Sequence, residues 1–364
     1  MMDKQELVRS IGQLFSSSVK KDKQIHNAYL LVHSDRLDLH VEAAEGKTDS
    51  LPADPRQPYF LASIGKLFTS VLIGMLVDQG KLSYDNEIAQ FLDDDLLAGL
   101  HVVKGTEYSK TIRIYHLLNH TSGLHDYFSD KPKNTRPMLD VILAEPERFW
   151  QAREVIQWSK THLKAHFPPG KGFHYSDTGY HILGLIIEKV AAVPFHQALS
   201  DYIFRPLGMN FSYLAGHSKP LQKSEFPVAS LYARNMNIIH FRSLSIDYAG
   251  GGIISTLSDQ LKFMTALKNG QLVKKNTFER MKDWVKFFNP FFIGIDYGYG
   301  LMSFKAIPLI LPAKYPAWGN AGSTGSFLFY HPGTDTYIIG SLNQFGYPQK
   351  GIQLVFKVIH QIMR

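Results

Sequence analysis

The stretch FLASIGKLFTSVLIGMLVDQGKLS at residues 60–83 places Ser63 and Lys66 three positions apart, where an apolar pattern with helical spacing begins. Residues i and i+3 of a helix lie on the same face, so the lysine amine can reach the serine hydroxyl. A serine becomes a nucleophile when a neighbouring base takes its proton, and a lysine can be that base. The helix N-terminus adds N–H groups that favour a developing oxyanion. The pair therefore indicates a nucleophile beside its base.

A plain structural role fits the same pair, because serine is a common helix cap and lysine a common solvated side chain. Two more Ser-x-x-Lys pairs, Ser17/Lys20 and Ser18/Lys21, stand at a polar helix end. Ser63 differs in its surroundings: Lys66 is followed by LFTSVLIGMLV at residues 67–77, which is apolar nearly all round. That run predicts a buried helix and a partly desolvated lysine.

A second candidate stretch is FHYSDTGYHILGLIIEKV at residues 173–190, where Tyr175 and Asp177 precede a periodic apolar helix. A phenol held beside a lysine ammonium can lose its proton, so Tyr175 could serve as a general base, with Asp177 orienting the lysine. The alternative is a loop tyrosine followed by an aspartate that only caps the helix.

A third candidate stretch is WGNAGSTGSFLFYHPGTD at residues 318–335, in which small residues run into a strand. The segment from Asn320 to Ser323, which includes Gly322, could let the backbone approach a substrate closely, with the Ser323 N–H facing an oxyanion. The alternative is a glycine-rich turn before an edge strand.

The ends of the chain carry the strand signals. Residues 26–46 and 326–344 each alternate with a period near two around a polar turn, and residues 5–20 and 351–364 have helical spacing. Residues between 63 and 259 favour helix. The pattern predicts an α+β fold: one catalytic unit with a sheet part at 1–62 and 260–364, terminal helices packed on the sheet, and a mostly helical part at 63–259.

Composition excludes several classes of protein and site. The 364 residues are 45% hydrophobic and 20% charged, and the net charge of +7 comes from scattered Lys and Arg, which argues against nucleic-acid binding. The absence of Cys excludes disulfides and thiolate metal sites, and no His-Glu-x-x-His occurs. No Gly-x-Ser-x-Gly elbow points to an α/β-hydrolase, and no phosphate-binding glycine fingerprint occurs.

The apolar run at 67–77 has eleven residues, against about 20 needed to span a bilayer, so no transmembrane segment is expected. The start lacks the apolar core of a secretory signal. The chain as written is expected in the cytoplasm, or in the periplasm or outside the cell if a signal was trimmed.

Taken together and in this order, the three stretches resemble the serine β-lactamase and penicillin-binding-protein superfamily. The chain is most similar to the class C β-lactamase-related group, which includes D,D-peptidases, D-aminopeptidases and esterases. Further stretches carry the resemblance along most of the chain, among them LLNHTSGLHDY, IFRPLGM and AGGGIISTLSDQLKF.

The resemblance implies that Ser63 is acylated, that Lys66 and Tyr175 share general base and acid work, and that backbone N–H groups of Ser63 and Ser323 form the oxyanion hole. It implies an antiparallel sheet with flanking terminal helices. It requires no cofactor or metal.

Two positions depart from the family pattern: Asp177 stands where the second motif usually has Asn, and Asn320 where the third usually has Lys or His. An ionised Asp177 would favour the ammonium form of Lys66 and shift the base role toward Tyr175. Asn320 offers no cation to a substrate carboxylate. The expected function is therefore a serine hydrolase acting on a small or peptide-like ester or amide. The alternatives are a D,D-carboxypeptidase or β-lactamase acting on cell-wall-like substrates, and a non-catalytic scaffold of the penicillin-binding type.

Overall fold

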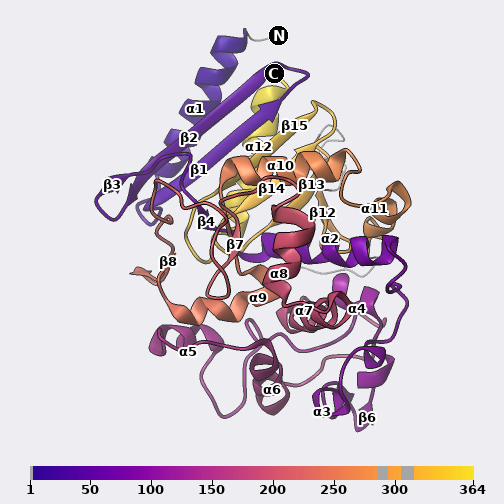
Figure 1. Ribbon diagram of the computed structural model, residues 1–364. Helices are drawn as coiled ribbons and strands as arrows, with labels where there is room; N and C mark the ends of the chain where they lie inside the picture. Colours follow the sequence, from indigo (N-terminus) through magenta and orange to yellow (C-terminus); the bar gives the residue numbers. More distant parts are fainter. Residues whose placement is uncertain (1–2, 286–293, 305–314) are drawn as a thin grey trace.

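A computed structural model describes residues 3–285, 294–304 and 315–364. Its main feature is an eight-stranded antiparallel sheet (Figure 1). In order across the sheet the strands are β11 (Ile295–Tyr297), β12 (Met302–Phe304), β13 (Trp318–Ala321), β14 (Phe327–His331), β15 (Thr336–Ser341), β1 (Asn27–Ser34), β2 (Leu39–Thr48) and β3 (Leu51–Pro52). The two predicted hairpins are β1–β2 and β14–β15.

The centre of the sheet joins the two ends of the chain. Strand β1 lies between β2 and β15, with Leu31 opposite Ile339. Alternate residues of β1 are buried on opposite faces: Leu30 belongs to one hydrophobic core and Leu31 to the other. The predicted terminal helices and the predicted helical insertion would each cover one face of the sheet, and burial on both faces agrees with this.

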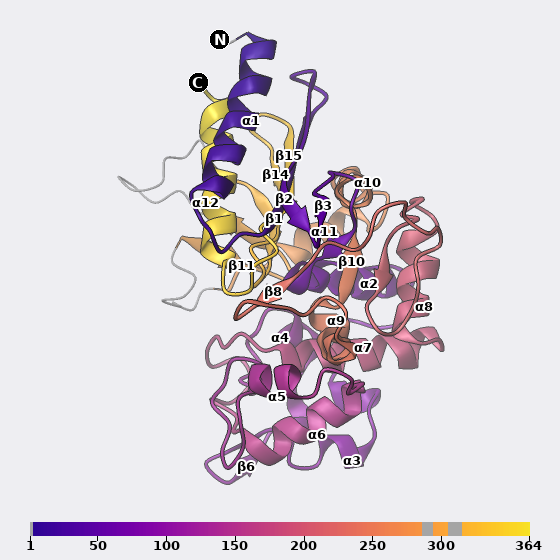
Figure 2. The same ribbon diagram turned by 90° about the vertical axis from the view of Figure 1, so that its left-hand side faces the viewer.

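One face of the sheet is covered by α1 (Lys4–Lys20) and α12 (Pro348–Ile362), which contact each other (Figure 2). Each helix buries one stripe against the sheet, with Ile11 and Phe15 on α1 and Val355 and Val358 on α12. The expected terminal helices are confirmed.

The other face of the sheet carries the remaining helices, most of which lie in the lower half of Figure 1. Its helices are η1 (Ala62–Ile64), α2 (Gly65–Asp78), η2 (Ile88–Gln90), α3 (Asp94–Leu97), η3 (Ser109–Thr111), α4 (Ile114–Leu118), α5 (Met138–Ala144), α6 (Ala152–His162), α7 (Asp177–Ala191), α8 (Phe195–Leu199), η4 (Ser200–Phe204), η5 (Arg242–Asp247), α9 (Tyr248–Gly251), α10 (Leu257–Lys268) and α11 (Lys275–Met281).

This part is not purely helical, because it also holds strands too short to show a period in the sequence. They are β4 (Tyr59–Phe60), β10 (Ile253–Ser255) and β7 (Tyr213–Leu214) in a three-stranded sheet, and the pairs β5 (Val102–Val103) with β6 (Thr106–Glu107) and β8 (Tyr232–Ala233) with β9 (Met236–Asn237).

The larger hydrophobic core lies between the sheet and these helices, and it joins Leu31 and Ile339 of the sheet to Phe68 of α2 and Ile182 of α7. Eleven of the fourteen residues of α2 are buried, which confirms the buried helix predicted after Ser63. The division of the chain at residues 62 and 259 stays a prediction.

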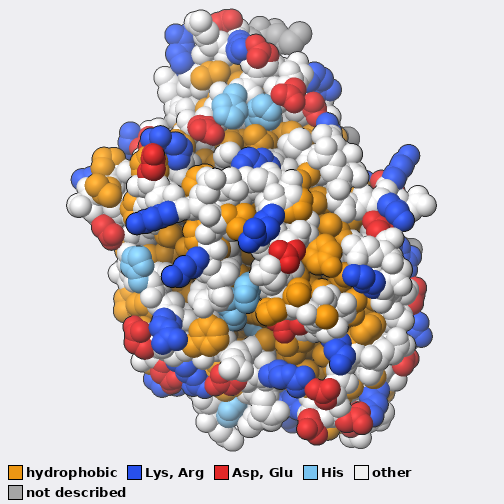
Figure 3. Space-filling model, in the orientation of Figure 1, with side chains coloured by type: hydrophobic (Ala, Val, Ile, Leu, Met, Phe, Trp, Pro, Cys, Tyr) orange, Lys and Arg blue, Asp and Glu red, His pale blue; other side chains and the backbone are white. Residues whose placement is uncertain are grey.

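The molecular surface mixes both signs of charge. In the view of Figure 3, Lys and Arg are interspersed with Asp and Glu over the whole face. Among the described residues no single helix has the length and hydropathy to cross a bilayer. One consecutive pair, Asp177–Ala191 and Phe195–Phe204, meets the criteria only when taken together, and it is bent by 75°.

Candidate active site

Ser63 lies in the short helix η1, two residues before α2 begins at Gly65. The preceding residue, Ala62, has a φ of 50°, a left-handed conformation that is costly for any residue but glycine. The turn is tightly enclosed: a Cβ on Gly251 would lie 2.8 Å from the Ala62 carbonyl carbon, and one on Gly322 would lie 2.8 Å from the Leu61 carbonyl oxygen. Glycine is therefore required on both sides of the turn.

Lys66 is fully buried directly behind Ser63. Its Nζ donates hydrogen bonds to Ser63 Oγ at 3.2 Å and to the Gly250 carbonyl oxygen at 2.9 Å, and it forms an ion pair with Asp177. By contrast, the Lys20 side chain of the second Ser-x-x-Lys pair is 69% exposed. Lys21 of the remaining pair is exposed as well, so of the three pairs it is Ser63 and Lys66 that lie together in a buried polar site.

The protonation of Lys66 is set by its partners. Burial alone would lower the pKa of Lys66, but the charges of Asp177 and Tyr175 and the hydrogen bonds to them outweigh burial, so its pKa lies above the ordinary value. Burial raises the pKa of Tyr175 to about 12, although Lys66 opposes that rise. At neutral pH the resting site therefore holds an ammonium and a phenol.

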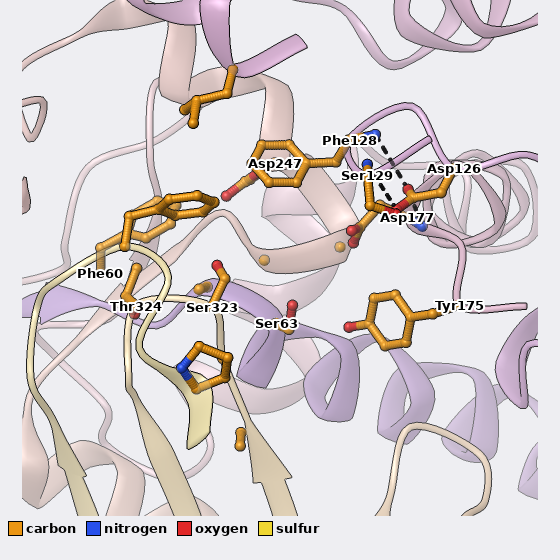
Figure 4. Close-up of a pocket in the computed structure, with 18 of the residues that line it drawn as sticks. Phe60, Ser63, Asp126, Phe128, Ser129, Tyr175, Asp177, Asp247, Ser323 and Thr324 are labelled. Carbon is orange, nitrogen blue, oxygen red and sulfur yellow. Dashed lines mark hydrogen bonds between the residues drawn. The ribbon is translucent and has the colours of Figure 1, made fainter. Parts of the chain in front are cut away.

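The Tyr175 hydroxyl points toward Ser63 and interacts with both Ser63 and Lys66 (Figure 4). Its loop is held by His120, whose carbonyl oxygen accepts from the His174 N–H at 2.9 Å and whose Nδ1 accepts from the Ser176 N–H at 3.1 Å. His120 thus positions the loop, and its ring packs against that of Tyr175 with centroids 4.2 Å apart.

Ser176 caps helix α7, because its Oγ accepts from the Gly179 N–H at 3.2 Å. Asp177 is the first residue of that helix and is free to pair with Lys66 instead of capping. The capping role considered for Asp177 therefore belongs to its neighbour.

The two residues expected to supply the oxyanion donors, Ser63 and Ser323, line the same cavity. Both are among the residues labelled in the close-up of this cavity in Figure 4. Within the described chain, neither of their backbone N–H groups donates to a protein acceptor. That these two N–H groups form an oxyanion hole stays a prediction.

The side chain of Asn320 does not line this cavity. Its side chain is fully buried, its Nδ2 donates to the Gly300 carbonyl oxygen at 2.7 Å, and it is absent from the described residues that line the cavity. The expected substrate contact of Asn320 is not supported, because this position of β13 turns its side chain into the protein. Ala321, the next residue, lines the cavity in its place.

The cavity has a volume of about 790 Å³, and its wall is mostly aliphatic and aromatic. The charged groups among its described lining residues are three carboxylates, and no Lys or Arg is included. These carboxylates belong to Asp126, Asp177 and Asp247.

Sequence reasoning missed Asp126 and Asp247. Asp126 accepts backbone hydrogen bonds from Asp177 at 2.9 Å and Ser129 at 3.1 Å. Burial and the nearby Asp177 carboxylate raise the pKa of Asp126 to about 6 and that of Asp247 to about 7. A signal was present, because each aspartate neighbours a tyrosine in or beside a stretch that resembles the family, HDY and DYAGGG.

Comparison with known proteins identifies relatives of this chain. It is 26% identical over 275 residues to Penicillin-binding protein 4* of Bacillus subtilis, which covers 70% of this chain and 54% of that protein. The chain thus spans about half the length of this relative.

Two solved structures have the same fold over nearly the whole chain. They are a D-stereospecific amidohydrolase from Streptomyces sp., with a TM-score of 0.78, 23% identity and coverage of 98% and 99% of the two chains, and the D-amino acid amidase from Ochrobactrum anthropi SV3, with a TM-score of 0.78, 22% identity and coverage of 96% and 99%. A family model described as Beta-lactamase matches residues 16–357. Because that match covers almost the entire sequence, this chain belongs to the β-lactamase family.

Proposed function

We propose that the protein is a serine hydrolase that forms an acyl-enzyme on Ser63 with an ester or amide substrate. The observation that carries the proposal is the contact of Ser63 Oγ with the buried Lys66 Nζ at 3.2 Å, at the wall of a largely apolar cavity. A buried lysine paired with a carboxylate and touching a serine hydroxyl is costly to maintain for structure alone.

In the proposed reaction Ser63 Oγ attacks the acyl carbon, and the carbonyl electrons move onto the oxygen, which accepts hydrogen bonds from the Ser63 and Ser323 N–H groups. Lys66 takes the serine proton as it passes one of its own to Asp177. The Tyr175 phenol then protonates the leaving group as the intermediate collapses. Water hydrolyses the acyl-enzyme by the same steps in reverse order.

The carboxylates of the cavity favour substrates with a free amine. Penicillins and peptides ending in D-Ala-D-Ala carry a carboxylate, which finds no Lys or Arg among the described lining residues. An ammonium group would instead meet Asp177 and Asp247. One neighbour in fold is named a D-stereospecific amidohydrolase and the other a D-amino acid amidase, which supports an amine-bearing amide as the substrate class.

The test compares wild type with Ser63→Ala on p-nitrophenyl acetate and butyrate, on the p-nitroanilides of D- and L-phenylalanine, and on nitrocefin. We expect wild type to turn over the esters and one of the p-nitroanilides. In Ser63→Ala the kcat for these substrates should fall by at least about 1,000-fold. Ser18→Ala removes the serine of another Ser-x-x-Lys pair and should leave the rates unchanged.

Equal rates in wild type and Ser63→Ala would contradict the proposal and favour a non-catalytic scaffold. Mass spectrometry after fluorophosphonate treatment gives an independent readout, since an activated Ser63 gains the label. Efficient nitrocefin hydrolysis with a micromolar KM would keep the mechanism but overturn the proposed substrate class.

A further inference from the structure

A compact group of potential metal ligands lies outside the catalytic residues, and one of its members, His174, lines the cavity. The Asp130 carboxylate contacts His166 Nε2 at 2.8 Å and His174 Nε2 at 3.1 Å. One ligand atom from each of the three residues lies within 4.8 Å of the others.

The spacing suits a single small cation. Zinc binds imidazole nitrogen and carboxylate oxygen at about 2.0–2.2 Å, so two ligand atoms on one ion stand roughly 3–4 Å apart. The two imidazole rings are tilted by 30° with centroids 3.6 Å apart, and both present Nε2 to the same carboxylate. Small rotations about the side-chain bonds suffice to admit an ion between the three groups.

The backbone around the ligands is fixed by hydrogen bonds. The Asp126 N–H donates to Asp130 Oδ2 at 2.8 Å, the type of outer contact that orients a ligating carboxylate. The His166 N–H donates to the Gly123 carbonyl oxygen at 2.8 Å, and the His174 loop is held by His120. The ligands therefore need little ordering when an ion binds.

The cluster is reachable from water. The side chains of His166, His174 and Asp130 are 37%, 24% and 17% exposed, and His174 also lines the cavity. Three protein ligands leave a fourth position for water.

We propose that Asp130, His166 and His174 bind one divalent transition-metal ion, with zinc as the natural probe. Two nitrogens and one oxygen suit borderline cations such as zinc, and disfavour calcium and magnesium, which prefer oxygen ligands. The bound ion connects the segment that contains Asp126 and Asp130 to the segment that contains His174 and Tyr175. It takes no part in the proposed acyl transfer.

The test is isothermal titration of zinc chloride into the full chain, stripped with EDTA and free of any histidine tag, together with thermal unfolding. We expect one ion per chain and a higher unfolding temperature with zinc, because an ion that binds only the folded state stabilises it. His166→Ala and Asp130→Asn should each weaken zinc binding by at least about 10-fold and abolish the thermal shift.

The matched control is His40→Ala. His40 belongs to another close pair, with its Nδ1 3.1 Å from His33 Nδ1, but that pair lies on β1 and β2, far along the chain from the proposed ligands. Its loss should leave zinc affinity unchanged.

Stoichiometric binding that is equal in wild type and His166→Ala would overturn the proposal, as would the absence of saturable binding. The cluster would then be a metal-free ion pair that pins the two segments. Because both readouts are binding and stability, they are independent of the proposed hydrolase activity.

Discussion

The ion pair between Lys66 and Asp177 sets the chemistry of the site. A buried ammonium without a partner is costly enough that the group loses its proton instead. The usual family residue at position 177 is neutral, so this chain holds Lys66 charged more firmly than the family pattern implies. In our proposal the general base is therefore Lys66 acting together with Asp177. The sequence analysis left the base and acid roles shared between Lys66 and Tyr175, and a Tyr175 that is protonated at rest suits the role of general acid.

Asp177→Asn should lower the pKa of Lys66 and make its amine a better resting base. Because wild type reacts from the ion pair and the variant only from neutral Lys66, the acid limb of the pH profile of kcat/KM for p-nitrophenyl butyrate is expected to move to higher pH. The kcat/KM for amine-bearing p-nitroanilides should fall by roughly 10-fold or more relative to that for the ester, as expected for the loss of one charge-assisted hydrogen bond. Steady-state kinetics from pH 5 to 9 on both substrates measure the two effects, and an unchanged preference would exclude Asp177 from amine recognition.

Asp247 provides a pH-dependent test of amine recognition. With a pKa of about 7, its carboxyl group is neutral below that pH and charged above it. For an amine-bearing substrate, the ratio of wild-type kcat/KM to that of Asp247→Asn should rise as pH increases through 7. Taking this ratio cancels the titration of the substrate amine. For p-nitrophenyl butyrate the ratio should stay flat; a parallel rise there would assign Asp247 a role unrelated to substrate charge.

At the level of elements, the fit of η1 against β13 and α9 fixes the nucleophile. Gly322→Ala should destabilise the protein by about 1–3 kcal/mol, the usual cost of overpacking. The matched change is Gly12→Ala in α1, where a Cβ would meet nothing within 4 Å. That variant should gain about 0.5–1 kcal/mol from helix propensity. Urea unfolding of both variants measures the two changes in the free energy of unfolding, which should have opposite signs. A Gly322→Ala variant as stable as wild type would mean that the turn can shift.

The elements that the sequence predicted are those with a strong local signal. Hairpins with a period of two around a turn and terminal helices with one apolar stripe need no tertiary knowledge. The direction of the Asn320 side chain was not predictable, because a shift of one residue along β13 exchanges inward and outward positions. Asp126 and Asp247 join Asp177 only through folding, from segments 51 and 70 residues away.

Across the whole molecule, the larger core crosses the predicted boundary between the two parts. It packs Leu31 and Ile339 of the sheet with Phe68 and Ile182 of the helical part. We therefore expect a single cooperative urea transition, with coincident circular dichroism and tryptophan fluorescence curves. Residues 63–259 expressed alone should lack cooperative unfolding. Two separated transitions in the full chain would instead support independent folding of the two parts.

The position of β1 between β2 and β15 has a consequence for biosynthesis. Leu31 leaves the ribosome about 300 residues before its partner Ile339. At roughly 5–20 residues per second, β1 waits about 15–60 s for the strand that completes its pairing. During that interval the apolar segment from Ala28 to Val32 has a free edge that other nascent chains can occupy. Soluble yield should therefore depend on chaperone supply and growth temperature more steeply than the stability of the finished protein would suggest.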